Sequence, residues 1–297
     1  MTRHERRWSA GVASGLIGML GFSGTFVATR VAVADLSPLT ITSARIVIAA
    51  VLGAITLIST GAVRIPERRF IPGILWMGLG LAVGFPLFLA LALESVPAVH
   101  GAVAIGLAPA ATAIIAVLRT GERPSIGFWI ACAIGFASVF YFAMDAGGGR
   151  IGLADGWLFL AVVSAGLAYV EGGRVSSELG GATTLSWAML FLAPAASILL
   201  IWSVQDLRFT AVSWSSWAGL AYLSVISMFI AAAFWYRGLA AGGIARIGQI
   251  NLLLPLAALA WSAILLGEEI TTTAGICAIV VFAAMITCLK SRVPSRP

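Results

Sequence analysis

LAPAATAIIAVLRTGE at residues 107–122 and LLPLAALAWSAILLGE at residues 253–268 share one sequence pattern. Each is a long apolar run with a proline near its beginning and a Gly-Glu pair twelve residues after that proline. Pro255 follows Pro109 by 146 positions, and the two Gly-Glu pairs are separated by the same interval. This spacing indicates that the chain contains two copies of one helical unit.

The second copy is expected to enter the membrane from the opposite face. The pair Arg30-Val31 recurs as Arg174-Val175, 144 positions later, so the match extends beyond the two apolar stretches. The predicted organisation is two five-helix repeats, at residues 8–146 and 153–290. Short cytoplasmic tails flank them at residues 1–7 and 291–297. Because five is odd, the second repeat is inverted. Inverted repeats are common in secondary transporters, whose substrate site lies near the bilayer midplane where the halves meet.

The composition places the chain in lipid. Of its 297 residues, 60% are hydrophobic and only 10% are charged, with a mean hydropathy of +1.03. Soluble domains carry about 25% charged residues. The net charge of +6 is scattered over short loops, which argues against a nucleic-acid partner. The three cysteines lie in apolar runs without CxxC spacing, and we expect no metal, no cofactor and no obligatory protein partner.

The apolar runs predict an all-α integral membrane protein with ten transmembrane helices. The predicted spans are 8–33, 39–60, 70–93, 97–118, 124–143, 155–173, 182–203, 214–236, 244–266 and 271–290. Their connections are short, so consecutive helices are antiparallel neighbours.

The distribution of Lys and Arg predicts that both termini are cytoplasmic. Thirteen of the 18 basic residues fall on the side of the N-terminus, and only Arg150 and Arg208 fall on the other. Positive residues are retained on the cytoplasmic side of a membrane. Three basic residues remain within predicted spans, Arg30, Arg45 and Arg246. We expect these three to reach toward a helix end or to pair with Asp35, although one of them is able to pair with a substrate carboxylate.

The chain resembles the drug/metabolite transporter superfamily, in particular its ten-helix exporters with two EamA-type repeats. The resemblance rests on Gly21-Phe-Ser-Gly-Thr-Phe-Val-Ala-Thr-Arg30, on Pro38 with Arg45, and on the two Pro and Gly-Glu units. Within the superfamily it is most similar to the YddG-type aromatic amino acid exporters. One departure is Gly21-Phe22, where many members carry Trp-Gly.

The resemblance implies export of small metabolites by alternating access through a central cavity, in a multi-pass protein of the bacterial inner membrane. It implies that helices one, three, four, six, eight and nine line the cavity. From the residues themselves, the cavity candidates are intramembrane polar and aromatic side chains, namely Gln249, Asn251, Tyr169, Phe85, Phe88, Ser23 and His100. Packing between helices or against lipid is the alternative role for each of them.

Two groups of ionisable residues are candidates for charge or proton sites. His100 with Glu94 is predicted to form an outer gate or a protonation site, the alternative being a solvated pair at a loop end. Glu171 is predicted either to touch substrate or to reach the headgroups. Trp235 and Tyr236 are predicted to belong to the interfacial aromatic belt.

Prolines within the spans are candidates for bending during transport, since each removes one backbone hydrogen bond. Pro86, Pro109, Pro194 and Pro255 lie inside spans. The gating candidates are Pro86, Pro109 and Pro255, of which the last two are repeat-related.

Three functions are weighed on this basis. The first is an exporter of amino acids, including aromatic ones, and related small metabolites. The second is an efflux transporter for lipophilic cations, which calls for an intramembrane carboxylate such as Glu171 or Glu94. The third is an intramembrane serine protease built on Gly21-Phe22-Ser23-Gly24, with His100 as its base. The expected protein is a transporter of a small molecule in a lipid bilayer and not an enzyme.

Overall fold

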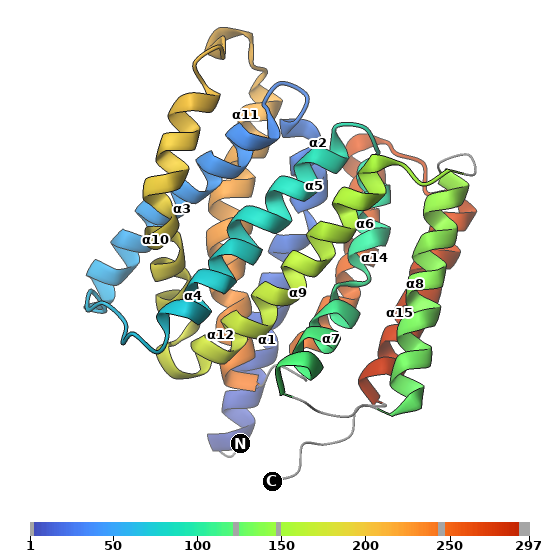
Figure 1. Ribbon diagram of the computed structural model, residues 1–297, viewed down its shortest axis with the longest axis horizontal. Helices are drawn as coiled ribbons and strands as arrows, with labels where there is room; N and C mark the ends of the chain where they lie inside the picture. Colours follow the sequence, from blue (N-terminus) through green and yellow to red (C-terminus); the bar gives the residue numbers. More distant parts are fainter. Residues whose placement is uncertain (1–2, 121–124, 147–149, 243–246, 291–297) are drawn as a thin grey trace.

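The computed structural model describes residues 3–120, 125–146, 150–242 and 247–290, and in these residues it contains helices and connections but no strand (Figure 1). The α-helices are α1 (Arg3–Ser23), α2 (Thr25–Ala32), α3 (Pro38–Thr60), α4 (Ile71–Gly78), α5 (Phe85–Leu93), α6 (Ala98–Ile105), α7 (Ala108–Thr120), α8 (Ile126–Ala146), α9 (Leu153–Leu179), α10 (Gly181–Ser203), α11 (Trp214–Ala221), α12 (Ala232–Gly242), α14 (Leu254–Leu266) and α15 (Thr272–Lys290). The π-helical segments are η1 (Leu79–Gly84) and η3 (Tyr222–Ala231), and the 3-10 segments are η2 (Phe209–Ala211) and η4 (Gly248–Leu253).

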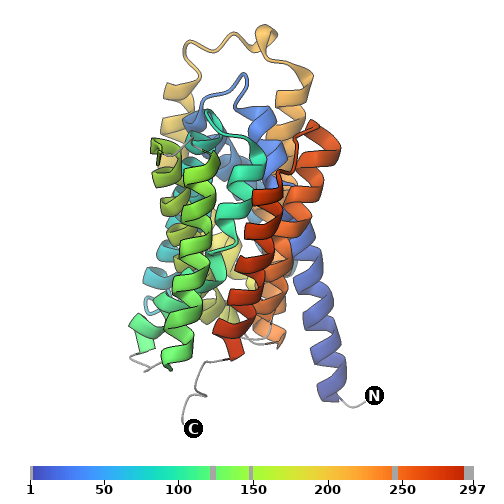
Figure 2. The ribbon, with the colours of Figure 1, turned by 90° about the vertical axis from the view of Figure 1, so that its right-hand side faces the viewer.

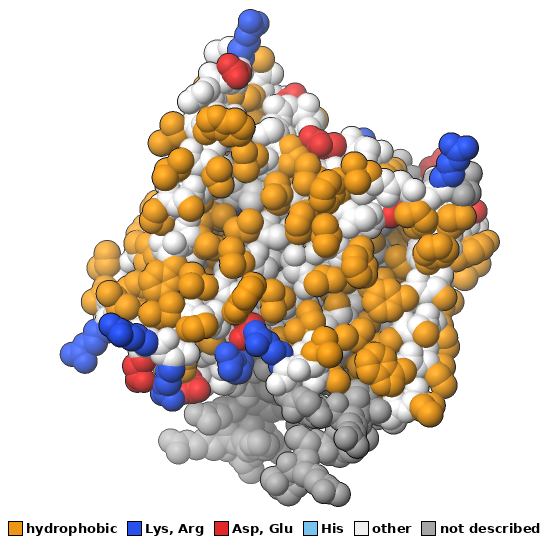
Figure 3. Space-filling model, viewed as in Figure 1, with side chains coloured by type: hydrophobic (Ala, Val, Ile, Leu, Met, Phe, Trp, Pro, Cys, Tyr) orange, Lys and Arg blue, Asp and Glu red, His pale blue; other side chains and the backbone are white. Residues whose placement is uncertain are grey.

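These elements form the expected transmembrane bundle. Among the described residues, eight helical segments are long and apolar enough to cross a bilayer, and two shorter apolar ones, Ile250–Leu266 and Thr272–Ala284, follow them. Hydrophobic side chains cover most of the face in Figure 3, with Lys and Arg near its upper and lower ends. The all-helical, membrane-spanning fold predicted from composition is therefore confirmed.

Two predicted helix ends are wrong by six residues. The eighth span was expected to end at residue 236, but α12 continues to Gly242. The sixth span was expected to stop at residue 173, next to the charges of Glu171 and Arg174, but α9 continues to Leu179. Glu171 is buried and ion-paired with Arg119 and Arg174. Because its charge is paired with two arginines, the helix carries it without ending there.

The helices pack as two inverted halves. We call the end of the bundle where α1 begins the proximal end and the opposite end the distal end; α9 begins at the distal end (Figure 1). α3 packs on α10, α8 on α15 and α6 on α14, and each pair joins two repeat-related spans. Contact of α1 with α12 is matched by contact of α5 with α9. Figure 2 shows α8 and α15 together on one side of the bundle.

Four spans depart from regular α-helix at repeat-related places. The third and eighth spans contain the π segments η1 and η3, and the fourth and ninth break before α7 and α14. Pro86, Pro109 and Pro255 are each the second residue of the α-helix that follows such a break. Each proline lacks the backbone N–H that would otherwise bond a carbonyl of the preceding turn, so a change in helical hydrogen bonding just before it is expected. π segments and local breaks of this kind often occur near functional sites in helical proteins.

Candidate functional site

The two repeats meet around a small cavity. Its volume is about 20 Å³, which is room for roughly one water molecule. The first repeat contributes Phe22, Thr25, Phe26, Arg45, Leu81, Phe85 and Ile105, and the second contributes Ala165, Tyr169, Ser227, Met228 and Leu254. Two of the candidates from sequence, Phe85 and Tyr169, lie in this lining, and the structure adds Arg45 from the second span.

Arg45 is the charged member of the lining. Its side chain is 2% exposed, and its Nη2 donates to Ser227 Oγ at 3.4 Å. Ser227 Oγ also lies 2.8 Å from Thr25 Oγ1. Arg45 Nε has no hydrogen-bond partner among the described residues. The prediction that Arg45 extends to a helix end is therefore wrong, because α3 is covered by α10 and η3 and holds the guanidinium inside the bundle.

Aromatic side chains form the apolar side of the site. Tyr169 lies against Trp235 with ring centroids 5.6 Å apart, and Phe22 lies against the same indole at 6.2 Å. Trp235 and Tyr236 are fully buried, and Tyr236 Oη donates to Ala168 O at 3.1 Å. Their assignment to the interfacial belt is wrong, because α1, α9 and α10 cover α12 on the inside of the bundle.

Asn251 adds a polar group next to this aromatic cluster. It lies in η4, is 4% exposed, and its side chain lies beside that of Tyr169. Its Oδ1 atom has no partner in the described part of the chain. Gln249 belongs to the same 3-10 segment, but its side chain lies outside the described residues, as does Arg246.

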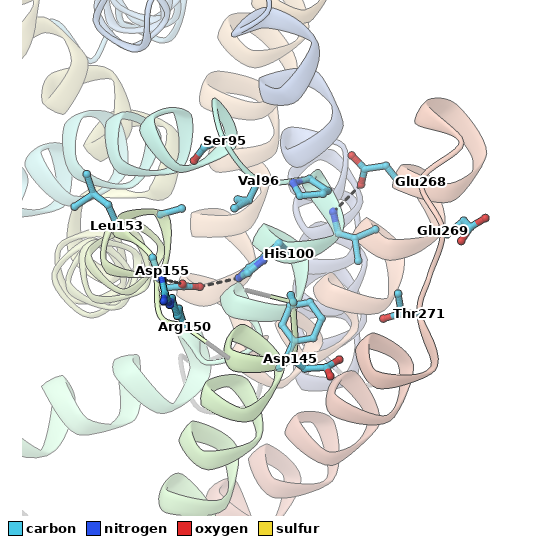
Figure 4. A pocket seen from close by; sticks show the side chains of 16 residues that line it. Ser95, Val96, His100, Asp145, Arg150, Leu153, Asp155, Glu268, Glu269 and Thr271 are labelled. Carbon is cyan, nitrogen blue, oxygen red and sulfur yellow. Dashed lines mark hydrogen bonds and ion pairs between the residues drawn. The ribbon is translucent and has the colours of Figure 1, made fainter. Parts of the chain in front are cut away.

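A larger pocket of about 730 Å³ opens at the distal end (Figure 4). Within it, His100 Nε2 of the first repeat lies 2.8 Å from Asp155 Oδ1 of the second. The predicted partner, Glu94, is exposed, and its backbone carbonyl accepts from Arg30 Nη1 at 3.3 Å. The pairing of His100 with Glu94 is therefore wrong, because inversion of the second repeat brings the start of α9 next to α6.

Glu268 also joins the repeats in this pocket. Its two carboxylate oxygens accept the backbone N–H groups of Ala98 and Val99, at 2.9 and 2.8 Å. These donors belong to the first turn of α6 and lack intrahelical acceptors. The Glu of the second Gly-Glu pair therefore caps a helix of the first repeat. The corresponding Glu122 lies outside the described residues.

Replacing Glu268 by Ala is expected to lower the free energy of unfolding by about 1–2 kcal/mol, because the capped N–H groups lose a charged acceptor. The neighbouring Glu269 is exposed, and Glu269→Ala should change it by less than about 0.5 kcal/mol. Thermal unfolding of the two purified variants in detergent measures the difference. Equal unfolding temperatures would show that the cap contributes nothing.

A second ionic contact joins the repeats near the proximal end. Glu171 of α9 is 2% exposed and accepts from Arg119 of α7 at 2.5 Å and from Arg174 at 3.0 Å. Glu171 thus reaches neither the central lining nor the surface. The prediction that it extends to the headgroups is wrong, because two arginines hold the carboxylate within the bundle.

The remaining candidates lie elsewhere. Ser23 Oγ donates to Leu20 O at 2.7 Å and accepts from Trp261 Nε1 at 3.0 Å, while His100 is paired with Asp155. The Ser23–His100 pair needed by the protease hypothesis is thus not formed in the described structure. Phe88 stacks on Trp157 with centroids 5.7 Å apart.

The pairing predicted for Asp35 with an arginine is also wrong. Asp35 accepts from the hydroxyl groups of Ser213 and Ser216 and from the backbone N–H of Ser213. These hydrogen bonds lower the pKa of Asp35, which lies in the loop between α2 and α3. Arg30 instead donates to Leu93 O at 2.6 Å.

An all-helical membrane protein with two inverted repeats around a central cavity has the architecture of a secondary transporter. The sequence profile of the EamA-like transporter family matches residues 9–144 and again residues 152–289. The chain therefore belongs to the EamA-like transporter family and is a multi-pass membrane transporter. The resemblance noted in the sequence is confirmed at this level.

One relative supports the assignment, and one solved structure shares the fold. The Bacillus subtilis (strain 168) protein named "Uncharacterized transporter YdeK" is 41% identical over 282 residues, which make up 95% of this chain and 96% of that protein. A solved structure described as "Crystal structure of protein" matches with a TM-score of 0.64 over 95% of this chain and 98% of its own. At 16% identity it shows a shared fold. The family and the name of the Bacillus relative point to a transporter rather than an enzyme.

Proposed function

We propose that this transporter exports amino acids, including aromatic ones, and related small metabolites across the bacterial inner membrane. The observation that carries the proposal is the two-sided lining of the central cavity. Arg45, Thr25 and Ser227 supply polar groups, and Phe22, Phe26, Phe85 and Tyr169 supply aromatic ones. A small molecule with a charged head and an apolar side chain matches such a lining, since polar groups orient a ligand within a mostly apolar pocket.

Alternating access accounts for the closed cavity. The His100–Asp155 contact lies toward the distal end and the Glu171–Arg119 contact toward the proximal end, and both join one repeat to the other. Rocking of the repeats breaks one contact while keeping the other, so the cavity opens to one side at a time. We propose that the proximal end is cytoplasmic, because most of the basic residues fall on that side.

The charges around the cavity disfavour the alternative that the protein exports lipophilic cations. A buried guanidinium in the lining repels a cationic substrate, and Glu171 is neutralised by two arginines outside the cavity. We therefore retain amino-acid export as the proposed function.

Counterflow into proteoliposomes tests this proposal. Labelled phenylalanine and leucine should enter saturably, and methyl viologen should not. Movement of methyl viologen without either amino acid would contradict the proposal.

Phe85→Ala is expected to raise the half-saturating phenylalanine concentration about three- to tenfold, because one aromatic contact is worth about 0.5–1.5 kcal/mol. Phe88→Ala is the matched control: it lies three positions away on the same helix and stacks on Trp157 instead of lining the cavity. The same counterflow assay measures both. Equal half-saturation in the two variants would remove Phe85 from the site.

A further inference from the structure

Arg45 carries a positive charge deep within the bundle. It lies seven residues after Pro38, where α3 begins, and so about 10 Å along the helix from its end. Only 2% of the residue is exposed. A cation in such a place is costly unless a negative group compensates it.

The acidic side chains with contacts in the described structure are engaged elsewhere. Asp35 binds serines, Asp155 binds His100, and Glu268 caps α6. Glu171 binds two arginines, and Glu67 and Glu178 bind Arg69 at the surface. Within the described residues, Arg45 has a single hydrogen bond, the long one to Ser227, and a free Nε. The described residues therefore provide no negative group for this charge, which is left for a bound molecule.

We infer that Arg45 binds the carboxylate of the transported molecule, so that the substrates are carboxylates and cations without a carboxylate are rejected. This inference rests on the proposed function and names the substrate class of the same cavity. The planar guanidinium presents N–H donors that fit a carboxylate in a bidentate manner. Ser227, itself hydrogen-bonded to Thr25, orients Arg45 from the second repeat, so closure of the repeats completes the carboxylate site.

Asn251 supplies the complementary group. Its unpaired Oδ1 is an acceptor beside Tyr169, and Tyr169 lines the same cavity as Arg45. A substrate ammonium needs acceptors of this kind. The carboxylate on Arg45 and the ammonium on Asn251 together select a zwitterion, with the carboxylate as the stronger anchor because its partner is charged.

Three related ligands separate the contributions: phenylalanine, 3-phenylpropionate, which lacks the amine, and phenethylamine, which lacks the carboxylate. Binding is measured as thermal stabilisation of the purified protein, and transport of phenylalanine as counterflow. Wild type should be stabilised by the first two ligands and not by phenethylamine. Arg45→Gln should weaken binding of both carboxylates at least tenfold, and Arg45→Lys, which keeps the charge and loses the bidentate geometry, should fall between.

If Arg45 served only to stabilise the fold, Arg45→Gln would lower the stability of the ligand-free protein. Removing an uncompensated buried charge should leave the ligand-free Arg45→Gln protein at least as stable as wild type. Arg30→Gln is the control, since Arg30 is half-buried and donates to backbone carbonyls of Leu93 and Glu94; it should leave ligand discrimination unchanged.

The outcomes distinguish this inference from the proposed function. Equal carboxylate binding by wild type and Arg45→Gln, or equal binding of phenethylamine and phenylalanine by wild type, overturns the carboxylate site. If 3-phenylpropionate binds through Arg45 but amino acids are neither bound nor carried, amino-acid export fails and the carboxylate site stands. If none of the three ligands binds to the folded protein, both proposals fall.

Discussion

Replacing Arg119 and Arg174 together by methionine is expected to lower the free energy of unfolding by about 3–5 kcal/mol, the cost of leaving a buried charge without its partner. Both arginines are more than half exposed, whereas the Glu171 side chain is 3% exposed. The loss therefore comes from the carboxylate that remains rather than from the arginines removed. The measurement is unfolding of the purified variant in mixed detergent micelles.

A third substitution tests this cause. Adding Glu171→Gln removes the buried charge, so the triple variant should recover most of the lost stability. Arg69→Met is the matched control, because Arg69 and Glu67 form an ion pair at 63% and 72% side-chain exposure, worth less than about 1 kcal/mol. No recovery in the triple variant would show that the arginines stabilise through packing of their side chains.

Gly80→Ala is expected to cost about 2–3 kcal/mol, by forcing apart two packed helical segments. Gly80 lies in η1 of the first repeat and faces α9 of the second. A Cβ atom there would lie 2.5 Å from Ser164 O and 3.0 Å from Ala168 N. Both neighbours are backbone atoms, so no side-chain rotation relieves the overlap. Small residues allow such close helix contacts in membranes.

Gly156→Ala gives the opposite expectation. This glycine lies in α9, and an added Cβ would meet no atom within 4 Å, so the change should be neutral or stabilise the helix by up to about 1 kcal/mol. Unfolding and counterflow are measured for both variants. If Gly80→Ala is as stable and as active as Gly156→Ala, the close contact between the repeats is not required.

The sequence predicts the membrane-spanning helices well, because the lipid bilayer imposes one simple condition on them. A segment that crosses the bilayer must be apolar over about 20 residues and must satisfy its own backbone, so composition alone locates it. The repeat of Pro109 as Pro255 then predicts the inverted arrangement, since the number of helices per repeat is odd. The error at α9 shows the limit of this approach: Glu171 marks the end of a span only if the charge meets water.

The sequence predicts less well which side chains within the spans line the cavity. Phe85 and Tyr169 were chosen for chemistry and lie in the cavity lining, whereas Phe88, three positions from Phe85, stacks on Trp157. Arg45 was predicted to reach a helix end or to pair with Asp35, because it lies within about two turns of such an end. The sequence did carry a signal for Arg45. A charged side chain within an apolar span is energetically costly, so it usually marks a functional site.

The sequence by itself determined a ten-helix membrane protein made of two related halves, because hydropathy and repeat spacing do not depend on how the helices pack. The tertiary structure decided which side chains meet. Arg45 with Ser227, His100 with Asp155, and Glu268 with the first turn of α6 all join one repeat to the other. Such contacts depend on the rotation and axial position of helices packed through small apolar residues. An almost uniformly apolar sequence leaves that rotation and position unspecified, because any face of such a helix is compatible with lipid.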